Sequence, residues 1–286
     1  MLVDEVAWLL RPRHGGWVID GTVGMAGHAE TILEQSGPDV RLLGLDLDPE
    51  AVDRARARLG RFADRVRLRR ASFRDLDAIA AAEGVTAARS ILLDLGVSSY
   101  QLDESGRGFS FSADDPLDMR LDPSSAHTAA ALLNELPEAE LARILFEYGD
   151  ERHARRIARV IVRRRPLATT GDLVAAVRGA VPRAAWSRRR HVATRTFQAI
   201  RIAVNDERGA LRRALQQAPA LLAVGGRLGI IAFHSGEDRM VKQTFRTLAR
   251  QGFAEIEPSP LVPGDDEVRA NARARSAKLR VLERLP

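Results

Sequence analysis

Short apolar runs alternate with helical patterns over the first hundred residues, and this alternation constrains the fold more than any other feature. Strand-like runs are predicted over residues 17–20, 41–46, 66–70 and 90–96, with a helix after each of the first three. The second of these helices has a clear start, because Asp48 can cap it while Pro49 takes its first position. Such alternation predicts a parallel sheet covered by helices on both faces.

The alternation stops at Tyr100 and resumes only with the apolar run 227–233. Helical patterns without a convincing strand fill the interval, which predicts an α-helical insert between the fourth and fifth strands. A helix over 237–250 and two short strands near 253–256 and 278–283 follow. This final pair favours the methyltransferase version of the doubly wound, Rossmann-like α/β fold over the dinucleotide version. We predict a sheet domain over 1–104 and 214–286 and an inserted helical domain over 105–213.

Composition excludes several kinds of protein. The 286 residues are 45% hydrophobic, enough for one full core and a smaller second unit. Cysteine is absent, so the chain has no disulfide framework, no thiolate nucleophile and no cysteine-based zinc site. Asp4 and Glu5 near the N-terminus have the wrong charge for a signal peptide, and no apolar run is long enough to span a membrane. We expect a cytoplasmic protein.

Basic charge is concentrated in one segment. Residues 150–213 contain 17 arginines and no lysine against five acidic residues, although the formal charge of the whole chain is only +6. An arginine-rich face on an otherwise acidic protein is typical of binding to a phosphate backbone, which favours RNA recognition by the insert. The alternative interpretation is a solvated helix surface in a sequence rich in alanine and arginine.

The stretch from Leu92 to Asp122 is crowded with glycines, serines, paired acids and two phenylalanines, and it has neither a strand nor a helix period. A connection of this composition indicates a functional site. A second unusual segment is the strand-to-helix turn 20–28, where three glycines allow the backbone to approach a ligand. Asp46 ends the next strand, where a carboxylate can accept hydrogen bonds from both ribose hydroxyls.

Together the turn and Asp46 predict an adenosine cofactor, although a glycine turn followed by an acid at a helix start remains the alternative. S-adenosylmethionine and NAD share the adenosine half. Acidic side chains at strand ends, Asp20 and Asp94, suit the cationic sulfonium of S-adenosylmethionine, whereas they would repel the pyrophosphate of NAD. A methyl donor therefore fits better than a nicotinamide.

Five sequence blocks, in order, closely resemble the bacterial 16S ribosomal RNA cytosine-N4 methyltransferases of the MraW type. The resemblance extends from the first strand almost to the C-terminus. It rests on DGTVGMAGH (20–28), DLGVSSYQLD with RGFSF and PLDMRLD (94–122), TRTFQAIRIAVNDE (194–207), FHSGEDRMVK (233–242) and NARARSAKLRVLER (271–284).

The resemblance implies methyl transfer from S-adenosyl-L-methionine to the N4 amine of a decoding-region cytosine, cytosine 1402, of 16S rRNA. The partner would be 16S rRNA or the small ribosomal subunit, with no membrane partner and no metal, and a homodimer is left open. The implied cofactor-binding residues are Ala26, Gly27 and His28 in the turn, Asp46 at the ribose, Phe73 at the adenine, and Asp94 and Gln101 near the methionine end.

Several of these residues have a structural alternative. Phe73 is equally an ordinary core phenylalanine, and His28 is more often a hydrogen-bonding residue at a helix start than a metal ligand. The sequence also departs from the family in places. Ala26 stands where the family usually has glycine, and the chain begins close to Leu2 without the family's preceding His-x-Pro segment, so a truncated start is one interpretation.

Asp94 is the predicted catalytic residue, because it ends the central strand where an acceptor for the target amine belongs. The alternative is that it serves only the cofactor. Tyr100, Phe109 and Phe111 are candidates for stacking against a flipped base, although core packing is equally expected for the phenylalanines.

Polar residues elsewhere have less specific predicted roles. His234, Ser235, Glu237 and Asp238 are expected to cap a helix and line the acceptor side of the pocket, since no nucleophile elbow accompanies them. The candidate phosphate contacts are Arg107, Arg120, Arg195, Arg201 and Arg188 to Arg190. An NAD-linked oxidoreductase and a non-catalytic RNA-binding assembly factor are the competing functions, and cofactor binding separates them from a methyltransferase.

Overall fold

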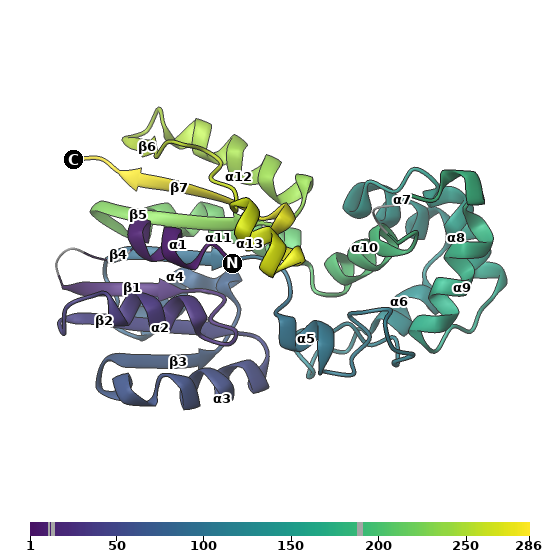
Figure 1. Cartoon of the computed structure of the whole chain (residues 1–286), viewed down its shortest axis with the longest axis horizontal. Coiled ribbons are helices and arrows are strands. Elements are labelled where there is room, and N and C mark those ends of the chain that lie inside the picture. Colours follow the sequence, from purple (N-terminus) through teal and green to yellow (C-terminus); the bar gives the residue numbers. More distant parts are fainter. Residues whose placement is uncertain (11, 13–14, 188–190) are drawn as a thin grey trace. The chain divides into compact units, whose positions relative to one another are not determined.

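A computed structural model describes residues 1–10, 12, 15–187 and 191–286 of the chain, and it contains one sheet of seven strands (Figure 1). The order across the sheet is β3-β2-β1-β4-β5-β7-β6. The first five strands are parallel, while β7 runs antiparallel to both β5 and β6. The strands are β1 Gly16–Asp20, β2 Val40–Asp46, β3 Val66–Arg70, β4 Ala88–Asp94, β5 Leu222–Ala232, β6 Phe253–Glu255 and β7 Lys278–Arg284.

Side chains alternate between two cores along each strand. On β4, Leu93 packs in the core that also contains residues of the helices α4, α11 and α12, whereas Leu92 packs with residues of α1, α2 and α3. Helices therefore cover both faces, which confirms the predicted doubly wound, Rossmann-like fold. The helices are α1 Val3–Leu10, α2 Gly27–Glu34, α3 Pro49–Arg58, α4 Leu76–Ala82, α11 Glu207–Leu221 and α12 Ser235–Leu248.

The predicted start of α3 is confirmed. The Glu50 N–H donates to Asp48 Oδ1 at 3.2 Å, and Pro49 is the first helical residue. One strand boundary was wrong: β5 begins at Leu222, well before residue 227, where the apolar run begins. Gly225, with φ of +71°, and Gly226 interrupt the apolar pattern, so the first part of the strand lacks a sequence signal.

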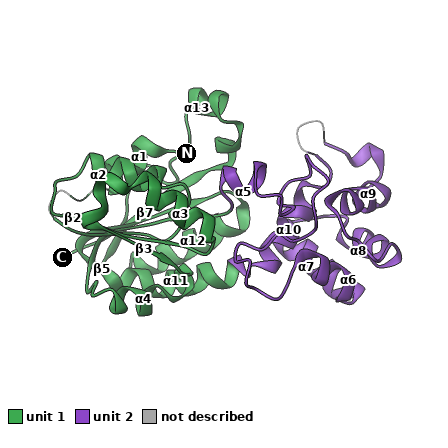
Figure 2. Cartoon of the chain, turned by 90° about the horizontal axis from the view of Figure 1, so that it is seen from below, with its two compact units in different colours: residues 1–96, 208–286 green, residues 97–207 purple. Residues whose placement is uncertain are grey.

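The chain forms two compact units, which Figure 2 shows in different colours. Unit 1 comprises residues 1–96 and 208–286 and holds the sheet, and unit 2 comprises residues 97–207. The predicted boundaries after residues 104 and 213 each lie a few residues too late. Val97 and Leu102 pack against the core of unit 2, and Leu211 packs against the core of unit 1. The division follows this burial and not the change of sequence pattern.

Unit 2 is helical around its own core. Its described residues contain an isolated bridge between Pro116 and Thr169 but no strand. The irregular segment before α6 is held by Asn205, whose Oδ1 accepts from the Leu121 N–H at 2.7 Å and whose Nδ2 donates to the Met119 carbonyl at 2.8 Å. The helices are α5 Ser99–Asp103, α6 Ala129–Glu135, α7 Glu138–Gly149, α8 Ala154–Arg163, α9 Thr170–Ala180 and α10 Thr194–Val204.

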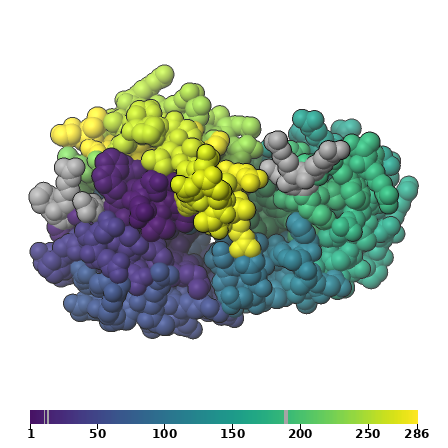
Figure 3. Space-filling view, in the orientation of Figure 1, coloured from purple at the N-terminus to yellow at the C-terminus, as the bar shows by residue number. Residues whose placement is uncertain are grey.

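The N-terminal segment contacts a helix from late in the chain on the surface of unit 1. The N-terminal helix α1 lies beside α13 (Asp265–Ala270), shown in purple and yellow in Figure 3. The Leu2 N–H donates to Glu267 Oε1 at 2.8 Å across this contact. Among the described residues, no helix has the length and apolar character needed to cross a membrane.

Candidate functional site

Three aspartates lie at one edge of the sheet. Asp20, Asp46 and Asp94 are the last residues of β1, β2 and β4, and these strands are neighbours in the order β2-β1-β4. Parallel strands end at the same edge, and the chain reverses its direction across the sheet between β1 and β4. This is the topological switch point where ligands bind in doubly wound folds.

The turn from β1 to α2 brings the backbone close to this edge. A Cβ on Gly21 would lie 2.5 Å from Leu93 Cδ2, so only glycine fits there. Ala26 precedes α2 with φ of +58°, in the left-handed region, and its methyl group is buried. The first helical residues, Gly27 and His28, follow it, so the predicted cofactor-binding residues of the turn are at the start of α2. Their N–H groups belong to the first turn of a helix, which leaves its donors without helical partners.

The Asp46 carboxylate is oriented by two backbone donors. Its Oδ2 accepts from the Gly24 N–H at 2.9 Å, and its Oδ1 accepts from the Asp48 N–H at 3.0 Å. Burial raises the pKa of Asp46 to about 6, while these two hydrogen bonds act in the opposite direction. Each oxygen keeps a second lone pair, which matches the predicted acceptance of two ribose hydroxyls.

Thr22 connects two of the aspartates, and its role was not predicted from the sequence. Its Oγ1 accepts from the Asp94 N–H at 2.7 Å, and its own N–H donates to Asp20 Oδ1 at 3.1 Å. Its position just after β1 could have indicated this role in the sequence, because a residue there lies near the end of the neighbouring strand in a parallel sheet.

His28 and Asp94 form the polar centre of the site. His28 Nε2 lies 3.5 Å from Asp94 Oδ2. His28 Nδ1 and Asp94 Oδ1 are buried, and neither has a hydrogen-bond partner among the residues that the structure describes. Buried polar atoms in proteins are almost always satisfied, so orphaned atoms on these two neighbouring side chains suit the polar groups of a ligand. An acceptor such as Asp94 Oδ1 suits the ammonium and sulfonium charges of S-adenosylmethionine, and the residues therefore fit this cofactor.

Asp20 is almost fully buried below this centre. Burial raises the pKa of its carboxyl to about 7, with Asp94 and Asp46 adding to the increase and His28 opposing it. Between about pH 4 and pH 7, the folded protein therefore keeps a proton on Asp20 that the unfolded chain, with an ordinary pKa of 3.8, has lost.

We expect the free energy of unfolding of the cofactor-free protein to fall as the pH rises from about 4 to about 7, because the folded state binds the extra proton throughout this range. Asp20→Asn keeps the acceptor for Thr22 and removes the charge. It should raise the free energy of unfolding at pH 8 by up to roughly 4 kcal/mol and have little effect at pH 4. Urea unfolding at both pH values measures this, and an equal effect at both would contradict it.

Phe73 lies beside the glycine turn. It begins the short 3₁₀ helix Phe73–Asp75, and its Cβ would be 3.1 Å from a Cβ on Gly21. The ring is partly buried against the core that contains α4. This position fits the predicted contact with adenine and also fits the alternative of a core phenylalanine, so the adenine contact stays a prediction.

Gln101 has a structural role in unit 2. It forms a capping box at the start of α5: the Ser98 N–H donates to Gln101 Oε1 at 2.9 Å, and the Gln101 N–H donates to Ser98 Oγ at 3.2 Å. Its side chain is buried. The predicted contact with the methionine end of the cofactor stays a prediction, because these hydrogen bonds already account for the position of the side chain.

The cluster after β5 caps a helix, as predicted. His234 Nδ1 accepts from the N–H groups of Gly236 and Glu237 at 3.2 and 3.4 Å, at the start of α12. Asp238 instead forms ion pairs with Lys278 and Arg280 of β7, at 2.9 and 2.8 Å. Asp238 therefore ties α12 to the sheet, and these pairs hold the pKa of its carboxyl below the usual value.

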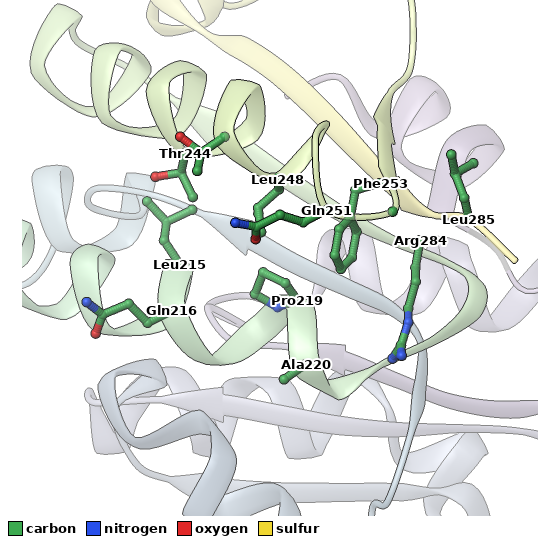
Figure 4. Close-up of a pocket in the computed structure, with 12 residues that line it drawn as sticks. Leu215, Gln216, Pro219, Ala220, Thr244, Leu248, Gln251, Phe253, Arg284 and Leu285 are labelled. Carbon is green, nitrogen blue, oxygen red and sulfur yellow. The ribbon is translucent and has the colours of Figure 1, made fainter.

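An open groove elsewhere on unit 1 does not coincide with the aspartates. It lies between α11, α12 and the end of β7, and Leu215, Pro219, Leu248 and Phe253 contribute its apolar lining (Figure 4). The Arg284 guanidinium beside it donates to the carbonyl of Leu222, the first residue of β5. The groove is therefore at the amino end of the parallel strands, opposite the carboxyl end. The described residues contain no cluster of side chains suited to hold a metal ion.

Four of the arginines predicted to contact phosphate have partners within the chain. Arg120 pairs with Asp118 at 2.7 Å, and Arg201 pairs with Glu207 at 2.7 Å. Arg107 and Arg195 donate to backbone carbonyls, of Arg120 and Asp150 respectively. These four side chains therefore have structural roles within unit 2. Arg188 to Arg190 lie outside the described residues.

Other arginines form an exposed ridge along α8. The α8 ridge comprises Arg152, which lies just before the helix, and Arg155, Arg156, Arg159 and Arg163, whose spacing puts these four on one face of the helix. Arg159 lies 3.5 Å from Glu138. The other four are exposed and have no acidic partner within the described part of the chain. Unpaired guanidinium groups at this spacing suit a row of phosphates.

The three aromatic candidates differ in exposure. Tyr100 and Phe109 are buried, 9% and 7% exposed, and Phe109 belongs to the core of unit 2. Phe111 is 36% exposed. The packing alternative therefore holds for Phe109, and Phe111 remains available to a ligand.

Comparisons with known proteins identify the family of this chain. The model of the MraW methylase family matches residues 1–285. A relative in Heliobacterium modesticaldum, called ribosomal RNA small subunit methyltransferase H, is 50% identical over 100% of this chain and 97% of its own length. A relative of the same name in Kosmotoga olearia is 48% identical over 100% and 96%.

A solved rRNA methylase of Streptococcus thermophilus is 13% identical, with a TM-score of 0.44 over 99% of this chain and 94% of that one. The family match and the two relatives confirm the resemblance seen in the sequence and the cofactor that it implied, S-adenosyl-L-methionine. On these grounds the chain belongs to the MraW methylase family.

Proposed function

We propose that this protein transfers a methyl group from S-adenosylmethionine to small-subunit ribosomal RNA, at the N4 amine of the decoding-region cytosine 1402. The observation that carries this proposal is the pair of orphaned buried atoms, His28 Nδ1 and Asp94 Oδ1, at the switch point of a methylase fold. The name that the relatives carry, ribosomal RNA small subunit methyltransferase H, supports the choice of RNA. Cytosine-N4 as the acceptor is inferred from the family resemblance of the sequence.

The residues around the switch point would hold the cofactor. Asp46, fixed by the N–H groups of Gly24 and Asp48, would accept the ribose hydroxyls, and Phe73 would flank the adenine. His28 and Asp94 would receive the methionine end. The bound cofactor supplies an electrophilic methyl group on a positively charged sulfur. The carboxylates of Asp46 and Asp94 at this edge favour this cation, since opposite charges at short range attract strongly where water is excluded.

Asp94 would also act on the acceptor amine. The lone pair of a cytosine amine is delocalised into the ring, so the amine is a poor nucleophile and must be aligned and hydrogen-bonded as charge develops on it. Asp94 Oδ1 would accept that hydrogen bond and then the proton that the nitrogen loses, as the new nitrogen–methyl bond forms and the methyl–sulfur bond breaks with its electron pair left on sulfur. Thr22 fixes the Asp94 backbone for this task through a 2.7 Å hydrogen bond.

The α8 ridge would supply the electrostatic contact with RNA. Four of its arginines are exposed and without an acidic partner among the described residues, whereas Arg120 and Arg201 of unit 2 are engaged in ion pairs. Guanidinium groups bind phosphate oxygens and release counterions, which supplies affinity without sequence selectivity. The choice of cytosine would then depend on contacts with the base itself.

The test is transfer of a labelled methyl group from S-adenosylmethionine to small-subunit RNA, followed by nucleoside analysis. We expect labelled N4-methylcytidine, and label in another nucleoside would contradict the N4 assignment. Naked 16S rRNA and assembled small subunits should be tested in parallel. Calorimetric titration should show binding of S-adenosylmethionine and none of NAD. The reverse result would favour an oxidoreductase, and binding of RNA without either cofactor would favour an assembly factor.

A further inference from the structure

Unit 2 carries an exposed aromatic pair that the methyl-transfer site does not use. Phe111 stacks on His191 with ring centroids 4.4 Å apart and an interplanar angle of 25°. Phe197, which is buried in the core, meets Phe111 edge-on at 5.3 Å. The contact with buried Phe197 therefore holds the Phe111 ring in place, while 36% of Phe111 stays exposed. Unlike Phe146, which is exposed without a ring partner in the described structure, Phe111 is held in one orientation by two neighbouring rings.

The His191 ring is held neutral in this pair. Its Nε2 lies 3.2 Å from Arg178 Nη2, and its Nδ1 faces the Ala193 N–H at 3.3 Å. Both nitrogens thus lie near donors, and a doubly protonated imidazole would place one more N–H group against a donor than the neutral ring does. Burial and the Arg178 charge accordingly lower the pKa of His191. The stacked ring remains an aromatic surface and carries no charge at neutral pH.

A positive charge lies at the rim of the pair. Arg178 on α9 is exposed, and its guanidinium lies between the His191 ring and the ring of Trp186, whose centroid is 6.0 Å away. No acidic side chain pairs with Arg178 among the described residues. Arg178 therefore keeps its full charge toward solvent at the edge of an aromatic surface.

We propose that the Phe111–His191 pair is a stacking platform for an unpaired base of single-stranded RNA, with Arg178 contacting the adjacent phosphate. The proposal rests on the proposed function, because it concerns how the RNA substrate is held. Single-stranded RNA is recognised through bases splayed onto aromatic side chains beside basic groups. The exposed Arg178 cation beside the rings matches the alternation of base and phosphate along a single strand of RNA.

Phe111→Leu should weaken the binding of a short single-stranded pyrimidine-rich RNA about tenfold, because leucine keeps the bulk but cannot stack. Phe111→Trp should bind at least as tightly as the wild type. Phe146→Leu is the matched control, since Phe146 is 64% exposed on α7 and has no ring partner in the described structure, and its affinity should not change. Fluorescence anisotropy with labelled RNA measures all four proteins.

An RNA of the same length with abasic sites separates stacking from other contacts. The wild type should bind it about tenfold more weakly than the intact RNA, and Phe111→Leu should cause no further loss. An equal loss on both RNAs, or no loss on the intact RNA, would overturn the proposal. If Phe111→Leu lowers the melting temperature of the protein, Phe111→Trp is compared with the wild type instead. Phe111→Trp should raise the affinity for the intact RNA and leave the affinity for the abasic RNA unchanged. An equal rise in affinity for both RNAs would refute stacking.

The methylation assay distinguishes this failure from failure of the proposed function. If the wild type methylates ribosomal RNA while Phe111→Leu binds RNA normally, only the platform is wrong. If the wild type binds RNA through Phe111 but transfers no methyl group, the proposed function is wrong and the platform stands.

Discussion

Replacing Asp94 by asparagine should lower the rate of methyl transfer by about 10²- to 10⁴-fold. Asparagine has nearly the same shape and keeps one acceptor oxygen, so the loss would come from the charge and the proton-accepting capacity. The carboxylate is positioned for both roles, with Oδ2 3.5 Å from His28 Nε2 and Oδ1 buried without a partner among the described residues. Single-turnover transfer at saturating cofactor measures the rate.

Two further measurements show whether Asp94 acts in methyl transfer or only in cofactor binding. Cofactor affinity is measured by calorimetry, and an unchanged transfer rate with weaker cofactor binding would show that Asp94 serves only the cofactor. Asp75→Asn provides the matched control in the same unit, because Asp75 is exposed and lies 3.7 Å from Arg213. It should change neither quantity.

Neutralising the α8 ridge should produce the second large effect. The fourfold variant Arg152→Gln, Arg155→Gln, Arg156→Gln, Arg163→Gln removes the exposed charges that have no acidic partner among the described residues. If each contacts one phosphate, the slope of log affinity against log salt should fall by about three for single-stranded RNA. Affinity at low salt should fall by roughly 10² to 10³, since each contact releases a counterion. Binding titrations at several salt concentrations measure the slope.

The control for the α8 ridge lies on the neighbouring helix. Arg143 on α7 is also exposed, but it pairs with Glu147 at 3.0 Å and Glu140 at 3.4 Å. Arg143→Gln should leave the slope unchanged, because a paired arginine releases no counterion to RNA. If the fourfold variant behaves like Arg143→Gln, the ridge is a solvated surface, as the alternative interpretation of the charge count holds.

Local patterns in the sequence predicted the sheet well. A short continuous apolar run indicates β4, and Asp48 with Pro49 indicates the start of α3, because these signals depend on residues close in the chain. Asp20, Asp46 and Asp94 follow directly, since each ends a predicted strand. Their meeting at one edge required only that the strands be parallel.

Partners far apart in the chain were not predictable in this way. The hydrogen bond between Thr22 and Asp94 and that between Leu121 and Asn205 join residues about 70 or more positions apart. Nothing in the neighbouring sequence distinguishes Arg201, which pairs with Glu207, from Arg155, which faces solvent. The candidate phosphate contacts chosen from the sequence were for this reason mostly structural arginines.

The sequence by itself determined the order of strands and helices, the position of the helical insert and the three carboxylates at the strand ends, because periodicity and capping are encoded within a few neighbouring residues. Only the tertiary structure decided which arginines are exposed, which phenylalanine stays open and where the two units divide. Those outcomes depend on burial and on hydrogen bonds between distant segments, and the folded chain alone specifies them.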